Sequence, residues 1–276
     1  MLREKMIHAV LFDLDNTLID FTAFKERTAR AAAKAMVAQG APVDENEAYR
    51  LIYDVYGHYG PEYEKTYSGV VKSFNLKDLN QTERIQQAAI VAHQTEMPKA
   101  FNPYPMVKHV LKELKRRGIK IAVVSDAPRN KAWKRLVMAG LGNEFDAVVT
   151  HSDTGTFKPD KKHFEIAIEQ LGITADACLF VGDNPGKDIR GAKEMGMYTC
   201  LAKYGLWDHT DQIKPDYEID RFSDLLGVIA VIDQKIKKEL LDKPIFKRSM
   251  QTLVRIVLPL RTAREKLARI TNKANG

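Results

Sequence analysis

The sequence has little of what secreted and membrane proteins require. Its 276 residues include only two cysteines, Cys178 and Cys200, and both lie in apolar stretches expected to be buried strands. Two cysteines cannot build a disulfide framework, so a reducing, cytoplasmic environment is expected. No uninterrupted apolar run approaches the ~20 residues of a membrane-spanning helix. The N-terminus has no signal-peptide hydrophobic region, and no transmembrane segment is predicted.

Internal repeats and low-complexity segments are also missing, and the composition is that of an ordinary globular protein. Hydrophobic residues make up 45% of the chain and charged residues 29%, and the length allows one or two domains. The net charge of +7 is unevenly distributed. Residues 235–276 hold 12 Lys/Arg against 3 acids, whereas residues 1–234 hold 31 basic and 33 acidic residues. The body is therefore nearly neutral, and the basic tail needs a separate explanation.

Helix and strand patterns alternate over much of the chain, which predicts a parallel, doubly wound α/β sheet. The expected strands are 9–12, 119–124, 145–150, 177–181 and 198–201, and the expected helices between the later strands are 130–139, 161–171 and 185–195, with a helix at 106–117 before the second strand. A further helix is expected at 222–242.

A helical block interrupts this alternation between about residues 20 and 100. Helices are predicted at 21–39, after the capping-box pattern Asp44-x-x-Glu47, at 62–74 and at 80–95. Six tyrosines between Tyr49 and Tyr67 are interpreted as packing residues of a small bundle. The expected division is residues 1–20 and 98–242 as the core, 21–97 as an inserted helical subdomain, and 243–276 as a basic helical C-terminal extension.

Polar side chains stand at the ends of three predicted strands. The apolar run 9–12 ends in Asp13 and Asp15, whose i, i+2 spacing directs both carboxylates to the same side of an extended chain. Ser125 ends the second strand, and Asp183 follows the strand 177–181, with Asp188 five residues later. Because ligands bind at the carboxyl ends of strands in open α/β sheets, these groups are expected to share one rim.

This set of side chains favours phosphate chemistry with a metal ion. Carboxylates gathered without thiols or imidazoles suit a hard, oxygen-preferring ion such as Mg2+. Backbone amides after Ser125 form a natural anion site, and Lys158 can neutralise a carboxylate or a phosphoryl group. One aspartate beside the metal could attack phosphorus while the other protonates the leaving oxygen.

Four motifs in order resemble the haloacid-dehalogenase (HAD) superfamily, specifically its phosphatases with a helical cap inserted soon after the first strand. They are Asp13-Leu14-Asp15-Asn16-Thr17, Ser125 after an apolar strand, Lys158-Pro159, and Gly182-Asp183-Asn184-Pro185-Gly186-Lys187-Asp188. The resemblance covers roughly residues 6–230. It implies a Rossmann-like core and an Mg2+-dependent phosphatase acting on a small phosphorylated metabolite of the sugar or glycolytic type, such as glyceraldehyde 3-phosphate or phosphoglycolate.

The resemblance also implies roles for the aspartates of these motifs. Asp13 would be the nucleophile that forms an aspartyl-phosphate, and Asp15 the acid for the leaving group and then the base for water. Asp183 would hold the metal together with Asp13 and the backbone carbonyl of Asp15. Asp188 would support the metal through its waters or orient Lys158.

The remaining motif residues are implied to contact the phosphoryl group. Ser125 and Lys158 would bind it, while Thr17 would shape the turn and contact phosphate less directly. Asp126 is interpreted as a turn residue, Arg129 as a solvated helix start, and His163 as structural.

Alternatives remain within and outside the superfamily. Dehalogenating members generally lack an acid two residues after the nucleophile, so Asp15 favours phosphate-ester hydrolysis, whereas a phosphomutase would retain both acids. The alternative from another class is a binding protein that uses its tail. In residues 243–276 apolar and basic side chains recur at helical spacing, as in helices that contact anionic membranes or RNA. A docked or disordered appendage is the simpler interpretation.

Overall fold

The computed structural model describes residues 6–206 and 213–242 of the chain. The described residues divide into two compact units, those within 8–225 and residues 6–7 together with 226–242. In the second unit the described helix is α10 (Leu225–Asp242), and the Ile7 N–H donates a hydrogen bond of 2.9 Å to the Asp233 carboxylate. No helix among the described residues is long and apolar enough to cross a membrane.

A six-stranded parallel sheet forms the centre of the unit 8–225. Its strands are β1 (Ala9–Phe12), β2 (Lys120–Ser125), β3 (Ala147–Thr150), β4 (Cys178–Gly182), β5 (Tyr198–Ala202) and β6 (Tyr217–Ile219), in the order β3-β2-β1-β4-β5-β6. Phe12 pairs with Val123 of β2 and Val181 of β4, so the three strands end at one edge. The predicted doubly wound sheet is confirmed. Strand β6 was not predicted, because its three residues form no apolar run.

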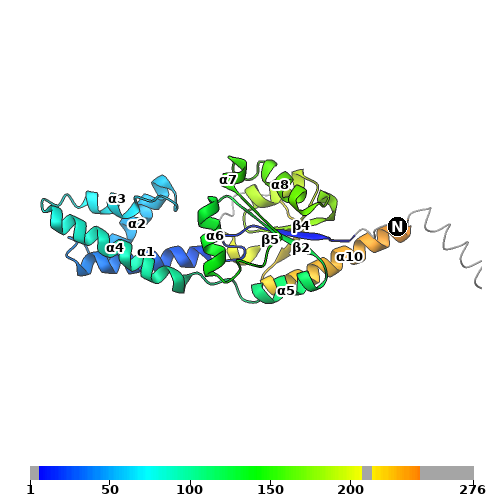
Figure 1. Ribbon diagram of the computed structural model, residues 1–276, viewed down its shortest axis with the longest axis horizontal. Coiled ribbons are helices and arrows are strands. Elements are labelled where there is room, and N and C mark those ends of the chain that lie inside the picture. The colour runs from blue at the N-terminus through cyan, green and yellow to red at the C-terminus, as the bar shows by residue number, and fades with distance from the viewer. Residues whose placement is uncertain (1–5, 207–212, 243–276) are drawn as a thin grey trace, which may run out of the picture. The chain divides into compact units, whose positions relative to one another are not determined.

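Helices cover both faces of the sheet, as the alternating pattern requires. They are α5 (Val107–Arg116), α6 (Arg129–Met138), α7 (His151–Thr154), α8 (Lys162–Leu171) and α9 (Arg190–Glu194). Figure 1 shows α5 and α8 on opposite faces. On the face of α8, Phe164 packs in one apolar cluster with Leu11 and Phe180. The predicted helix 185–195 is a π-helical turn over Pro185–Ile189 that runs into α9.

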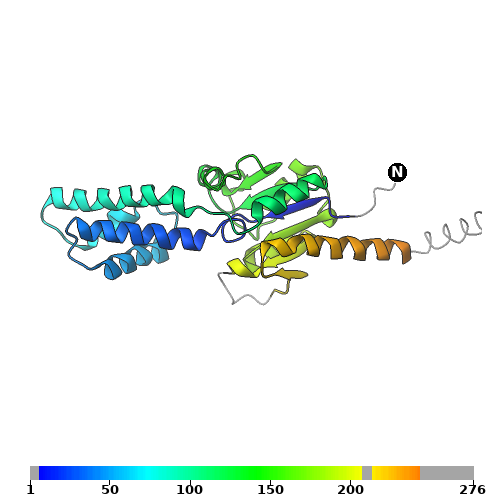
Figure 2. The same ribbon diagram turned by 90° about the horizontal axis from the view of Figure 1, so that it is seen from below.

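Four helices, α1 (Phe21–Ala38), α2 (Glu45–Tyr59), α3 (Thr66–Ser73) and α4 (Leu79–Ala100), follow β1 and form a bundle with its own apolar cluster. Figure 2 shows α1 and α4 running beside each other. The Asp44 carboxylate accepts the Glu47 N–H at 2.8 Å, as the capping pattern predicts. Most of the tyrosines pack in this cluster, but Tyr59 is 66% exposed.

The chain leaves the sheet for the bundle and returns to it through two adjacent segments. Ile19 forms an antiparallel bridge with Pro103, and the Tyr104 N–H donates to the Leu18 carbonyl at 3.0 Å. Asp20 then caps α1 by accepting the Ala23 N–H. The bundle is therefore attached close to the carboxyl end of β1.

Candidate active site

The loop after β1 turns back sharply and directs its acids toward the edge of the sheet. Asn16 adopts a left-handed conformation with a φ of 61°, and its N–H donates to the Ile19 carbonyl at 2.7 Å. Gly205 approaches this turn so closely that a Cβ there would lie 1.7 Å from the Asn16 carbonyl oxygen. Only glycine permits this approach, so the segment after β5 helps to hold the loop.

Three buried carboxylates and one lysine meet at the carboxyl edge of the sheet. Asp13, Asp183 and Asp188 each offer an oxygen, and these oxygens lie within 4.8 Å of one another. The Lys158 ammonium donates to Asp13 at 2.6 Å and to Asp188 at 2.7 Å. It also donates to the Val124 carbonyl at 3.1 Å. The structure thus brings together the residues that directly follow β1 and β4, one residue of the π-helical turn Pro185–Ile189 and one of the loop between α7 and α8.

Burial and mutual repulsion perturb the protonation of this cluster. Burial raises the pKa of Asp13 to about 7, against the opposing effect of Lys158. Burial also raises the pKa of Asp183 well above its usual value, and the neighbouring Asp13 and Asp188 raise it further. For Lys158, burial alone would lower the pKa, but Asp13 and Asp188 raise it well above its ordinary value. Lys158 is therefore charged, and its single positive charge would not balance the three acids if all of them were ionised.

The donors present fit a divalent, oxygen-preferring cation. Each of the three acids is at most 7% exposed, and no thiol or imidazole belongs to the cluster. A cation would offset the repulsion that raises the carboxyl pKa values. Gly182 is part of this arrangement, because a Cβ on it would lie 2.4 Å from an Asp188 carboxylate oxygen. The predicted pair Gly182-Asp183 thus has a steric reason.

A cavity of about 200 Å³ opens over this cluster. Its lining includes Asp13, Asp15, Ser125 and Lys158. The Ser125 hydroxyl accepts the Ala127 N–H at 3.1 Å, so the hydroxyl is fixed at the start of the loop after β2. Asp13, Asp15 and Ser125 were predicted to share one rim, and the structure places them together with Lys158.

Thr17, the remaining predicted phosphate contact, is fully buried. Its hydroxyl donates to an Asp183 carboxylate oxygen at 3.3 Å, and its carbonyl accepts the Tyr204 hydroxyl at 2.8 Å. Thr17 therefore supports the acid cluster.

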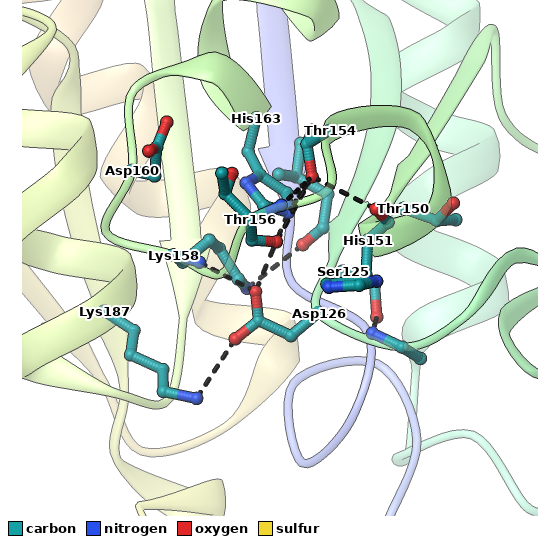
Figure 3. A network of polar contacts seen from close by, with 12 residues as sticks. Ser125, Asp126, Thr150, His151, Thr154, Thr156, Lys158, Asp160, His163 and Lys187 are labelled. Carbon is teal, nitrogen blue, oxygen red and sulfur yellow. Dashed lines mark hydrogen bonds and ion pairs between the residues drawn. The ribbon is translucent and has the colours of Figure 1, made fainter.

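A second polar network anchors the Lys158 loop, and Asp126 lies at its centre (Figure 3). The Asp126 carboxylate accepts the Lys158 backbone N–H at 2.9 Å and the Lys187 ammonium at 3.1 Å. His163 is buried nearby, and its Nε2 lies 3.1 Å from the Thr154 hydroxyl. Asp126 thus joins the loops that follow β2 and β4, which goes beyond a local turn role.

Arg135 of α6 is a site residue that the sequence interpretation missed. It is only 5% exposed, and its guanidinium forms ion pairs with Asp15 and with Glu62, in the segment between α2 and α3. Its distance of 120 residues from Asp15 leaves no local pattern. The one available signal is a basic residue in the helix that follows the Ser125 strand, and many basic residues in α6 share it.

Asp15 differs from the other acids in its surroundings. One of its carboxylate oxygens is bound by Arg135, and the other is buried without a hydrogen-bond partner among the described residues. Burial raises its pKa, and Arg135 opposes this shift. An orphaned buried acceptor beside the cavity is a position where a protonated or proton-bearing group can bind.

Comparison with known proteins identifies the family. Residues 7–196 match the haloacid dehalogenase-like hydrolases, and the chain belongs to this family. It is 32% identical over 225 residues to a glyceraldehyde 3-phosphate phosphatase of Methanocaldococcus jannaschii, covering 81% of this chain and 97% of the relative. The same enzyme of Methanopyrus kandleri is 33% identical over 230 residues, with 81% and 97% covered. The resemblance predicted from the sequence is confirmed.

A solved structure supports the fold. The HAD phosphatase from Thermococcus onnurineus has a TM-score of 0.56 and 24% sequence identity to this chain. The match covers 80% of this chain and 97% of that one. At this identity the likeness concerns the fold alone.

Proposed function

We propose that this chain is an Mg2+-dependent phosphatase that hydrolyses small phosphate monoesters through an aspartyl-phosphate on Asp13. The observation that carries the proposal is the Lys158 ammonium between Asp13 and Asp188 at the floor of a cavity of about 200 Å³. A phosphoryl group fits such a site because lysine, backbone amides and a cation all favour its negative charge.

Asp13, Asp183 and Asp188 would hold the ion, together with the backbone carbonyl of Asp15. The ion would polarise the phosphoryl oxygens and lower the repulsion between ester and carboxylate. Asp188 has a second task, since its ion pair fixes Lys158. Asp183 is in turn fixed by the Thr17 hydroxyl.

The reaction uses the two acids of the first loop in different roles. The Asp13 carboxylate attacks phosphorus, a new oxygen–phosphorus bond forms, and the bond to the ester oxygen breaks. Asp15 gives its proton to that oxygen, so the alcohol leaves neutral. Asp15 then takes a proton from water, whose oxygen attacks phosphorus and breaks the bond to Asp13. Ser125 and Lys158 bind the phosphoryl oxygens in both steps.

The bundle α1–α4 acts in this proposal as the cap of the active site. Residues 1–20 and 98–242 are the catalytic core, and residues 21–97 are the cap. Support comes from Glu62, which reaches Arg135 beside Asp15, and from Lys131 of α6, which lies 2.9 Å from Glu62. A cap over the cavity would exclude water and contact the leaving group.

A panel of phosphorylated metabolites, assayed with and without Mg2+, tests the function. It includes glyceraldehyde 3-phosphate and phosphoglycolate, and free phosphate is measured. Wild-type protein is expected to hydrolyse members of the panel with Mg2+ and not with a chelator. Asp13→Asn is expected to lose activity by at least about 10³-fold, because amide oxygen is a poor nucleophile.

The exposed Asp220 supplies the matched control for that substitution, since it lines neither cavity and Asp220→Asn makes the same chemical change. If wild type released no phosphate from any ester, the enzyme proposal would fail. Activity retained by Asp13→Asn would instead refute the nucleophile assignment.

Dehalogenase and phosphomutase activities are the alternatives in the same family. A dehalogenase needs no acid at this position, because a halide leaves without a proton. Here Asp15 lines the cavity and is bound by the buried Arg135, which favours hydrolysis of a phosphate ester. Transfer to a second hydroxyl of a sugar phosphate, with no free phosphate released, would favour the mutase.

The basic segment 243–276 lies outside the described residues, so the proposal that it binds an anionic membrane surface or RNA rests on the sequence. Binding to anionic vesicles and to RNA is measured for the full chain and for a truncation after Leu241. Equal binding by both proteins would refute this proposal. We also propose a cytoplasmic location, because Cys178 and Cys200 are buried free thiols.

A further inference from the structure

A second and larger cavity lies next to the phosphoryl site. It has a volume of about 430 Å³ and is lined by residues of the bundle α1–α4, the segment between α2 and α3, and α6. Arg135 stands between the two cavities, because it lines the larger one and binds Asp15, which lines the smaller one. An ester oxygen that receives a proton from Asp15 would therefore lie at this junction, and the rest of the alcohol would extend toward the larger cavity.

Positive charge predominates in the wall of the larger cavity. The charged lining residues are Lys25, Lys131, Lys134 and Arg135 against Glu62 and Glu64. Lys131 and Arg135 both pair with Glu62, and Arg135 also binds Asp15. Two of the four cations, Lys131 and Arg135, therefore form ion pairs with carboxylates. The other two cations are Lys25 and Lys134.

Lys25 is the inner of these two lysines, since Lys134 is exposed and Lys25 is half-buried. Its ammonium donates to the Pro61 carbonyl and lies 4.4 Å from the centre of the Tyr56 ring. Among the described residues no carboxylate lies within ion-pair distance of it. The rings of Phe21 and Phe24 lie 5.6 and 5.8 Å from the same ammonium. A half-buried ammonium whose partners are a carbonyl and aromatic rings has capacity for an anion.

The charges around the cavity also favour an anion beside Lys25. Burial lowers the pKa of Lys25 to about 7, and the nearby charges of Arg135 and Lys131 lower it further, against the smaller opposing effect of Asp15. An anion bound in the cavity would offset both the burial and the repulsion, and would return the ammonium to its charged form.

We propose that Lys25 is a specificity-determining residue that binds a negative charge on the leaving group. The preferred substrates are then phosphate monoesters whose alcohol itself carries a carboxylate or a second phosphate. This inference rests on the proposed phosphatase function and narrows its substrate class. Esters with an uncharged alcohol, glyceraldehyde 3-phosphate among them, leave Lys25 without an anionic partner.

Matched pairs of esters test the inference. Phosphoglycolate and 2-hydroxyethyl phosphate differ only in a carboxylate against a hydroxymethyl group, and fructose 1,6-bisphosphate and fructose 6-phosphate differ in a second phosphate. The measured quantity is the ratio of kcat/KM within each pair. Wild type is expected to favour the charged member of at least one pair by about 10- to 100-fold, the value of one charge-assisted hydrogen bond. The pair that shows the preference identifies the anion as carboxylate or phosphate.

Substitutions in α1 assign the preference to one side chain. Lys25→Gln is expected to lower the ratio by about 10-fold or more, and Lys25→Arg to restore part of it. Lys34→Gln makes the same change at an exposed position of the same helix and should leave the ratio as in wild type. The Arg variant retains the charge and keeps the test informative if Lys25→Gln does not fold.

Hydrolysis of p-nitrophenyl phosphate separates the two levels of the proposal, because its leaving group carries no carboxylate or phosphate. If it and all other esters are inert, the phosphatase function fails, and the inference fails with it. If it is hydrolysed but both ratios are near one, the inference alone is overturned. A ratio that Lys25→Gln leaves unchanged, with both members of a pair slowed equally, also overturns it.

Discussion

Substitution of Arg135 by methionine separates proton transfer from the rest of the proposed reaction. Methionine keeps most of the length and apolar bulk of the side chain, so it can fill the space beside Phe21, whose ring centre lies 4.2 Å from the guanidinium. It cannot bind Asp15 or Glu62. The change therefore frees the proposed acid and base while leaving Asp13, Lys158 and the carboxylate cluster in place.

The size of the effect follows from the surroundings of the two ion pairs. Loss of one partner of a fully buried pair costs about 3–5 kcal/mol. Asp15 and Glu62 keep side-chain exposures of 23% and 35%, so solvent can take over part of the interaction. We expect the free energy of unfolding to fall by about 2 kcal/mol. A positioned acid raises the rate by about 10²–10⁴-fold. Loss of its orientation in Arg135→Met should lower the rate by about 10- to 100-fold.

The assay compares two leaving groups in wild type and Arg135→Met. An alkyl phosphate such as 2-hydroxyethyl phosphate needs a proton on its leaving oxygen, whereas nitrophenolate leaves without one. We expect kcat for the alkyl ester to fall about 10- to 100-fold and kcat for p-nitrophenyl phosphate to change much less. Arg129→Met, at an exposed arginine of the same helix, is the control and should affect neither substrate. Equal losses on both esters would show that Arg135 supports the fold of the site and not the acid.

Three further predictions concern the metal site and the core. Gly182→Ala should raise the Mg2+ concentration needed for half-maximal activity by at least about 10-fold, because its Cβ would displace Asp188, whereas Gly57→Ala, with nothing within 4 Å of the new Cβ, should leave it unchanged. Mg2+ should raise the Tm of wild type, and Asp183→Asn should abolish this shift; an equal shift in both proteins would place the ion elsewhere. His163 has its pKa lowered from 6.5 to about 4 by burial, so the unfolded state binds its proton first and stability is lost as the pH falls below 6.5. The free energy of unfolding, measured with urea, should fall between pH 7 and pH 5 by about 2 kcal/mol less in His163→Gln than in wild type. Equal decreases in the two proteins would contradict a neutral buried imidazole.

Local pattern was sufficient to predict the strands and the residues at their carboxyl ends. In β1, β2 and β4 a buried apolar run meets polar residues at one point, and parallel pairing then brings the ends together. The same reasoning failed for β6, whose Tyr-Glu-Ile sequence is stabilised by pairing with β5 and not by its own apolar content. The sequence pattern also predicted one helix over 185–195, because the π-helical turn Pro185–Ile189 and α9 continue a single helical pattern.

The residues that sequence reasoning missed act across long separations. Arg135 lies 120 positions from Asp15 and 73 from Glu62, and Asp126 binds lysines 32 and 61 positions away. Each of these is an ordinary charged residue in its own segment, and only the tertiary fold brings its partners next to it. The motifs therefore predict which atoms can perform the chemistry. The arrangement of Arg135 and Lys25 around the larger cavity, which no motif contains, bears on the alcohol that the proposed acid Asp15 would release.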